Sequence, residues 1–114
     1  MTAYKTSYNF VATLSLFPTE NGGRKKPVYD HYRPSFAFNT VNTVNQFSGE
    51  VSFPNLDELR PGGTATANIK LLASRHISQK LKSGDSFTIL EGDKIVGTGV
   101  ILEIEQENRV PVAH

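Results

Sequence analysis

A two-residue alternation of apolar and polar side chains runs through most of this chain and restricts it to β-structure. The clearest run covers residues 64–71, where Ala, Ala, Ile and Leu alternate with Thr, Thr, Asn and Lys. Successive side chains of a β-strand point to opposite faces of a sheet, so such a run predicts a strand that is buried on one face. Thr, Val, Ile and Phe, which fill many of these runs, favour strands.

Six runs of this kind are predicted to be strands, at residues 10–16, 35–39, 47–53, 64–71, 86–89 and 95–104. Clusters rich in Gly, Pro, Asn and Asp separate them and predict turns, and Glu91-Gly92-Asp93-Lys94 is short enough for a tight hairpin. The only helical candidate is residues 76–82, with one or two turns. Six strands with short turns predict an all-β fold, a small antiparallel barrel or sandwich, and closure into a barrel would remove exposed sheet edges.

The alternation in the last predicted strand divides its residues between two faces. One face would carry Val96, Thr98, Val100, Leu102 and Ile104, and the other would carry Ile95, Gly97, Gly99, Ile101 and Glu103. The two glycines indicate a place where another segment approaches the backbone closely. Glu103, Glu105 and Glu107 are also expected to share a face, and we interpret them as a solvated strand surface rather than a catalytic carboxylate pair.

Length and composition exclude several classes of protein. The 114 residues have room for one domain, which we predict to span 1–114 with its core at 8–105. The formal net charge is only +1, so the strong positive charge of a dedicated nucleic-acid-binding domain is absent. The absence of Cys excludes disulfides, thiolate metal sites and a Cys nucleophile. No signal peptide or membrane span is recognisable, which favours a cytoplasmic protein.

No motif for catalysis or cofactor binding is present in the sequence. The chain lacks the glycine and lysine spacing of a phosphate-binding loop, so no nucleotide is expected. His31, His76 and His114 are far apart, which argues against a metal site. Asp30 precedes His31, but neighbouring side chains in a loop usually point apart. We therefore expect no metal, no cofactor and no enzymatic activity.

The segment from Glu20 to Pro34 is the richest in candidate binding residues. It holds four of the chain's twelve basic residues and two tyrosines, namely Arg24, Lys25, Lys26, Arg33, Tyr29 and Tyr32. Cations and aromatic rings on a loop can bind a phosphate backbone and stack on a sugar or base. The alternative is a solvated crossover loop whose tyrosines cover one end of the barrel, and composition leaves both interpretations open.

The order of several short motifs resembles the C-terminal β-barrel of translation elongation factor Tu. That domain has a strand followed by GGR and then GYRPQFYFRT, and this chain has Gly22-Gly23-Arg24, Tyr32-Arg33-Pro34 and Phe36-Ala37-Phe38. Glu91-Gly92 and Val96-Gly97-x-Gly99-Val100 match its later motifs, so the resemblance covers residues 8–104. It implies a six-stranded antiparallel Greek-key barrel, here without the family's GTPase domain.

The resemblance also implies particular binding residues. In the family this barrel contacts the backbone of aminoacyl-tRNA and takes part in contacts with the nucleotide-exchange factor. Arg24, Glu91 and Gly92 match tRNA-contacting positions, Ser35 replaces a Gln, and Ser48 and Arg75 are aligned less closely. Arg33 matches strictly but is interpreted as structural, and Lys25 and Lys26 add charge beyond the family pattern. The candidate binding set is Arg24, Lys25, Lys26, Arg33, Ser35, Ser48, Arg75, Glu91 and Gly92.

Two functions follow as hypotheses. The first is a non-catalytic translation-factor-like module that binds tRNA weakly, or binds a protein partner of elongation factor Tu, through the basic loop and the hairpin. The second is an accessory or immunity-like protein that reuses the barrel to bind a protein and has no role in tRNA binding. A purely structural domain ranks third.

Overall fold

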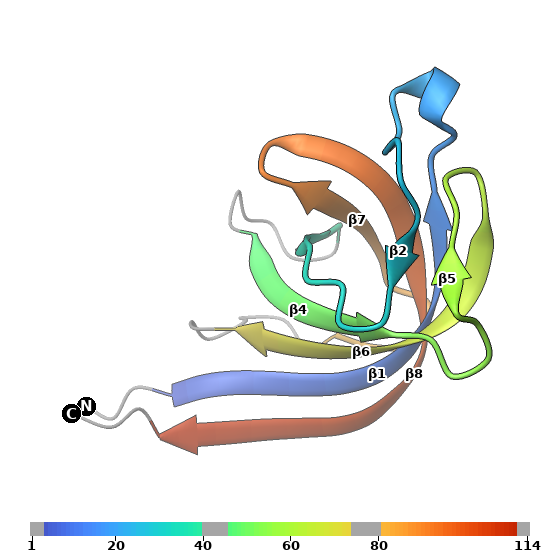
Figure 1. Ribbon diagram of the computed structural model, residues 1–114. Coiled ribbons are helices and arrows are strands. Elements are labelled where there is room, and N and C mark those ends of the chain that lie inside the picture. The colour runs from blue at the N-terminus through green and yellow to red at the C-terminus, as the bar shows by residue number, and fades with distance from the viewer. Residues whose placement is uncertain (1–3, 40–45, 74–80, 112–114) are drawn as a thin grey trace.

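The computed structural model describes residues 4–39, 46–73 and 81–111 (Figure 1). Within them the chain forms eight strands and one short 3-10 helix. In chain order these are β1 (Tyr4–Leu16), η1 (Thr19–Asn21), β2 (Val28–Tyr29), β3 (Ser35–Phe38), β4 (Phe47–Ser52), β5 (Glu58–Leu59), β6 (Thr64–Ala73), β7 (Ser86–Glu91) and β8 (Lys94–Pro111). Among the described residues, no helix has the length and apolar character needed to cross a membrane.

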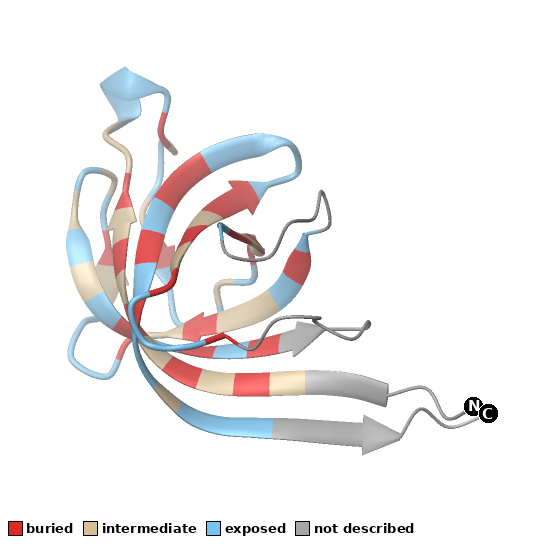
Figure 2. Cartoon of the chain, turned by 180° about the vertical axis from the view of Figure 1, so that it is seen from behind, coloured by how far each residue is buried: buried red, intermediate tan, exposed pale blue. Residues whose placement is uncertain are grey.

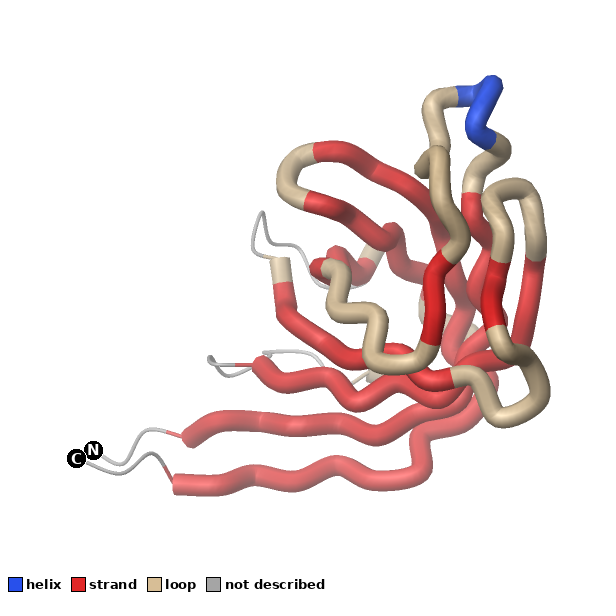
Figure 3. The backbone as a smooth tube through the Cα atoms, viewed as in Figure 1, coloured by secondary structure: helices blue, strands red, loops and turns tan. Residues whose placement is uncertain are grey.

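Six strands close into an antiparallel barrel in the order β1-β6-β4-β3-β7-β8, which confirms the predicted fold (Figure 3). Every strand pair in this barrel is antiparallel. Strands β3, β4 and β6 are successive neighbours in the barrel. Strand β1 precedes β3 in the chain but pairs with β6, at the far side of this group, which is the Greek-key arrangement. Because β1 and β3 are not adjacent, residues 17–34 must cross the end of the barrel to connect them, and we call this segment the crossover loop.

Aromatic rings fill the centre of the barrel. Phe10, Phe36, Phe38 and Phe87 are each at most 3% exposed, and their rings pack against one another. Buried and exposed residues alternate along the strands, as Figure 2 shows, so the two-residue pattern of the sequence correctly predicted most of the core. The densely packed rings provide a rigid support for the loops at the end of the barrel.

The face assignment for the last strand was wrong because β8 contains three register shifts. They fall at Val96, Leu102 and Glu105, each of which has no partner residue in the neighbouring strand's register. A bulge adds one residue and moves every later side chain to the other face. Val96 and Ile101 are therefore both buried, whereas Val100 and Leu102 are 41% and 48% exposed.

The same shifts separate the acidic residues of β8. Glu103 pairs with Val11, and Glu107 pairs with the buried Tyr8, so these two side chains lie on opposite faces of the β1–β8 ribbon. The expectation of one shared acidic face was thus wrong. The close approach at the glycines is confirmed, because a Cβ on Gly99 would overlap the Phe87 ring and lie 2.9 Å from the Thr13 carbonyl oxygen.

A small second sheet was not predicted. Strands β2 and β5 pair as Val28 with Leu59 and Tyr29 with Glu58, and they join the crossover loop to the segment before β6. Two-residue strands are too short to show a period, so the sequence pattern could not reveal them. The helical candidate at residues 76–82 lies almost wholly outside the described residues, and its described part, Leu81 and Lys82, is not helical.

Candidate functional site

The crossover loop is fastened to the β7–β8 hairpin by three side chains. Nε of Arg24 donates to Oε2 of Glu91 at 2.5 Å, and the Tyr32 hydroxyl donates to the same oxygen at 2.5 Å. The Arg24 guanidinium also lies over the Tyr32 ring, 5.3 Å from its centroid, in a cation–π contact. The Arg24–Tyr32–Glu91 cluster thus joins the middle and the C-terminal end of the crossover loop to the hairpin.

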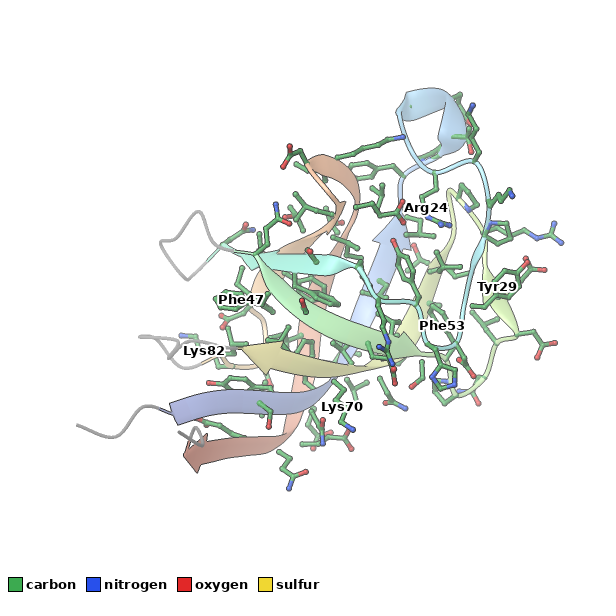
Figure 4. The ribbon with its side chains drawn as sticks, turned by 60° about the vertical axis from the view of Figure 1, so that its left-hand side comes forward. Arg24, Tyr29, Phe47, Phe53, Lys70 and Lys82 are labelled. Atoms are coloured by element: carbon green, nitrogen blue, oxygen red, sulfur yellow. The ribbon has the colours of Figure 1, made fainter. Side chains whose placement is uncertain are left out.

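Arg24 is further occupied by the loop's own backbone. Its Nη1 donates to the carbonyl oxygens of Lys26 and Pro27, at 2.7 and 3.1 Å. Its side chain is only 22% exposed, and Figure 4 places it between the loop and the barrel. A guanidinium with a carboxylate and two carbonyl partners has few donors left for a phosphate. In this geometry Arg24 and Glu91 act first as positioning residues for the loop.

Tyr32 is in an unusual electrostatic environment for a tyrosine. Partial burial raises the pKa of its hydroxyl well above the ordinary value of 10, and the hydrogen bond to the Glu91 carboxylate raises the pKa further. The phenolate would lie beside a negative carboxylate, so the neutral hydroxyl is strongly favoured. Tyr32 therefore stays a hydrogen-bond donor over the whole physiological pH range.

This environment makes a prediction about the Tyr32→Phe variant. The folded pKa exceeds the unfolded one, so the hydroxyl's contribution to stability is full below about pH 10 and is lost as the pH rises through the folded pKa. We expect the variant to be about 1 kcal/mol less stable at neutral pH, with the difference shrinking above pH 10. In an ultraviolet titration of the tyrosines, the variant should lack the phenol that loses its proton at the highest pH.

The matched control is Tyr29→Phe, because the Tyr29 side chain is 57% exposed. It should leave both the late titration and the pH dependence unchanged. An unaltered titration curve above about pH 11 in Tyr32→Phe would contradict the assignment.

A second ion-pair cluster lies where the crossover loop leads into β3. Arg33 donates from Nε and Nη2 to Oε2 of Glu50 at 3.1 and 2.9 Å, and His31 Nδ1 lies 3.5 Å from the other carboxylate oxygen. The hydrogen bonds from Arg33, with a smaller contribution from His31, lower the pKa of Glu50 below its ordinary value. This contact supports the interpretation of Arg33 as a structural residue.

Asp30 and His31 do not form a catalytic pair. The Asp30 carboxylate accepts a hydrogen bond from the Phe53 backbone N–H at 2.7 Å, whereas His31 faces Glu50. Among the described residues, no three His, Asp or Glu side chains gather as ligands of a metal ion would.

The other candidate binding residues lie on β3, on β4, in the β7–β8 hairpin and in the crossover loop. Ser35 pairs with Ser48 across β3 and β4, and Gly92 forms the hairpin turn with a φ of +63°. Lys25 and Lys26 are exposed, and neither forms an ion pair within the described part of the chain. Arg75 lies outside the described residues. The structure therefore brings Arg24 and Glu91 into contact and leaves the two lysines accessible.

One cation near this loop was missed at the sequence level. A shallow concavity of about 420 Å³ is lined by Thr19, Lys25, Pro27, Glu58, Arg60 and Pro61. Arg60 stands in an Arg-Pro-Gly-Gly turn, and the sequence pattern indicated only the turn. The short β2–β5 pairing brings this turn beside the crossover loop, so Arg60 joins Lys25 at one opening.

The closed barrel, its Greek-key order and a crossover loop fixed to the β7–β8 hairpin define a small antiparallel β-barrel domain with a loop held across one end. Residues 3–105 match the family model described as Elongation factor Tu C-terminal domain. The chain belongs to this family, which confirms the resemblance carried by the sequence motifs. The C-terminal domain of elongation factor Tu is non-catalytic, and the GTPase activity lies in the first domain.

Proposed function

We propose that this chain is a non-catalytic, translation-related binding module that acts in the cytoplasm and contacts the phosphate backbone of tRNA. The supporting observation is a group of exposed cations at the crossover loop: Lys25 and Arg60 line the concavity, and Lys26 follows Lys25 in the chain. Arg60 lies 3.7 Å from a carboxylate oxygen of Glu58, but its side chain is 79% exposed. We call this group the loop cation cluster. Arg24 and Glu91 would hold the loop in place, and the lysines would make the phosphate contacts.

Lysine suits such a role because it is a mobile point charge that needs no particular geometry at the phosphate. Each phosphate neutralised lowers the slope of log affinity against log salt by about 0.7–0.9. Three cations give a slope of about −2 to −3, so binding would be weak at physiological salt and clearest at low salt. This fits the net charge of +1, since the favourable charge is local.

The proposal is tested by titrating labelled aminoacyl-tRNA with the protein at several salt concentrations. Lys25→Ala and Lys26→Ala are each expected to weaken binding several-fold at low salt and to reduce the salt slope by about one. The control is Lys82→Ala, because Lys82 is exposed and lies far from Arg24 in Figure 4. No binding at low salt, or an equal loss in the control, would contradict tRNA recognition at this site.

A protein-binding accessory role is the second candidate, and one observation favours it. Arg24 and Glu91, which match tRNA-contacting positions of the family, bind each other in this chain. The barrel could then present the surface of a translation factor to that factor's protein partners. A pull-down from the source cell would give a defined protein complex that is insensitive to nuclease, whereas tRNA-dependent capture would be lost after nuclease treatment.

A further inference from the structure

The last strand of the barrel, β8, extends beyond the end of its neighbour β7, which pairs with it on the side away from β1. The pairing of β7 with β8 ends at Ser86 and Val100, and the last backbone contacts join Ile101 to Gly84 and Asp85. From Leu102 to Pro111, no described strand pairs with β8 on the side away from β1. Figure 1 shows this part of β8 as the outermost strand, extended beside β1 and away from the barrel.

A strand edge of this kind is a template for another strand. In an antiparallel pair the hydrogen bonds to the partner come from alternate residues, so the remaining N–H and C=O groups point to the open side. The edge from Leu102 to Pro111 would be about 33 Å long at the usual strand rise. The family match ends at residue 105, so residues 106–111 extend the edge beyond the matched domain.

The bulges leave a long regular stretch of this edge. They lie at Leu102 and Glu105, and from Gln106 to Pro111 the pairing with β1 continues without a shift. Natural proteins usually protect exposed edges with short strands, coverings, bulges or charged side chains. In β8 the bulges interrupt only the first part of the edge, and its regular part from Gln106 to Pro111 offers backbone hydrogen bonds to an incoming segment.

Charge decides which segment fits this edge. Glu103 and Glu105 are both exposed along it. A second copy would bring its own Glu103 and Glu105 to the edge, whereas a basic segment would bring charges opposite to these carboxylates. Opposite charges across paired strands are favourable and like charges are not, so the edge fits a basic segment better than a copy of itself.

We propose that the open edge of β8 binds an extended segment of another protein as an added strand, with Lys or Arg of that segment opposite Glu103 and Glu105. The backbone would supply the general affinity, and the two carboxylates would select for basic residues. The proposal concerns a different surface from the loop cation cluster and does not depend on tRNA binding.

The test uses a capped ten-residue peptide of alternating Lys and Val, titrated into the full chain by calorimetry. Two further peptides serve as probes, one with Glu in place of Lys and one with N-methyl groups on alternate residues. We expect the Lys–Val peptide to bind, to protect backbone amides near residues 102–107 from hydrogen exchange, and to bind more tightly than either probe. The N-methyl peptide should fail because it cannot complete the ladder.

The protein variants separate an edge site from simple charge attraction. The double change Glu103→Lys and Glu105→Lys should weaken binding about tenfold, since two attractive pairs become repulsive. Glu20→Lys with Asp57→Lys changes the net charge equally at exposed sites away from the edge, and it should alter binding less than twofold. All four positions are exposed, so both variants should fold, which circular dichroism verifies.

Three kinds of result would overturn the proposal. One is equal affinity for the plain and N-methylated peptides, or an equal loss in the two double variants, since either means non-specific attraction. Another is the absence of binding with the peptide at millimolar concentration. The third is a concentration-dependent dimer that protects the same amides without peptide, which would make a second copy of the chain the occupant.

Discussion

Replacement of Phe87 by alanine is expected to lower the free energy of unfolding by about 3–5 kcal/mol. The side chain is 1% exposed, and its ring centroid lies 5.4 Å from that of Phe38, 5.6 Å from Phe36 and 6.1 Å from Phe10. Removing the ring leaves a cavity that three rings from two other strands cannot fill without moving. A domain of this size has about 5–15 kcal/mol of total stability, so the variant would be close to unfolding.

Chemical denaturation followed by circular dichroism measures this effect. Phe87→Leu keeps most of the volume and should cost less, so a value is still obtained if the alanine variant does not fold. Tyr29→Ala is the control, because this exposed ring should change stability by less than about 0.5 kcal/mol. If Phe87→Ala cost no more than Tyr29→Ala, the aromatic cluster would not be the centre of the core.

Replacement of Gly23 by alanine should have the second largest effect, because it acts on the crossover loop through the backbone. A Cβ at this position would overlap the carbonyl oxygen of Phe17 and come within 2.7 Å of that of Pro18. Backbone atoms cannot rotate away as a side-chain tip can, so the loop must move. We expect a loss of about 2–3 kcal/mol and, because Lys25 follows closely, weaker tRNA binding in the assay above.

Gly22→Asn is the matched control for this change. Gly22 has a φ of +89°, and no atom lies within 4 Å of the position that a Cβ would occupy. Asn also tolerates the left-handed region better than other non-glycine residues. The control should therefore cost less than about 1 kcal/mol. Equal stability of Gly23→Ala and the original chain would show that the loop adapts freely, and the proposed fixed presentation of Lys25 would then be wrong.

The sequence predicted the barrel well because its strands carry one buried face. Residues such as Phe10 and Ile69 follow the two-residue period, and their burial agrees with it. The period failed in β8, where bulges at Val96, Leu102 and Glu105 interrupt it. A bulge depends on how two strands fit together, and a single strand's pattern does not contain that information.

The candidate site was predictable only in part. The resemblance named Arg24 and Glu91, but their contact joins residues 67 positions apart and follows from the barrel's closure rather than from either motif. Tyr32 was noted only as an aromatic residue of a basic loop, yet it completes the cluster. Arg60 had no signal beyond a turn, because the short β2–β5 sheet that positions it has no period to detect.

The pairing of β1 with β8 has a consequence for how the chain acquires its structure during synthesis. Tyr4 lies opposite Pro111 and Leu16 opposite Gly97, so the first strand made is joined along its length by the last. At about 5–20 residues per second, β1 would wait roughly 5–20 s for that partner to emerge from the ribosome. Such distant pairings are slow to form, so the nascent barrel stays open until translation of the domain is nearly finished.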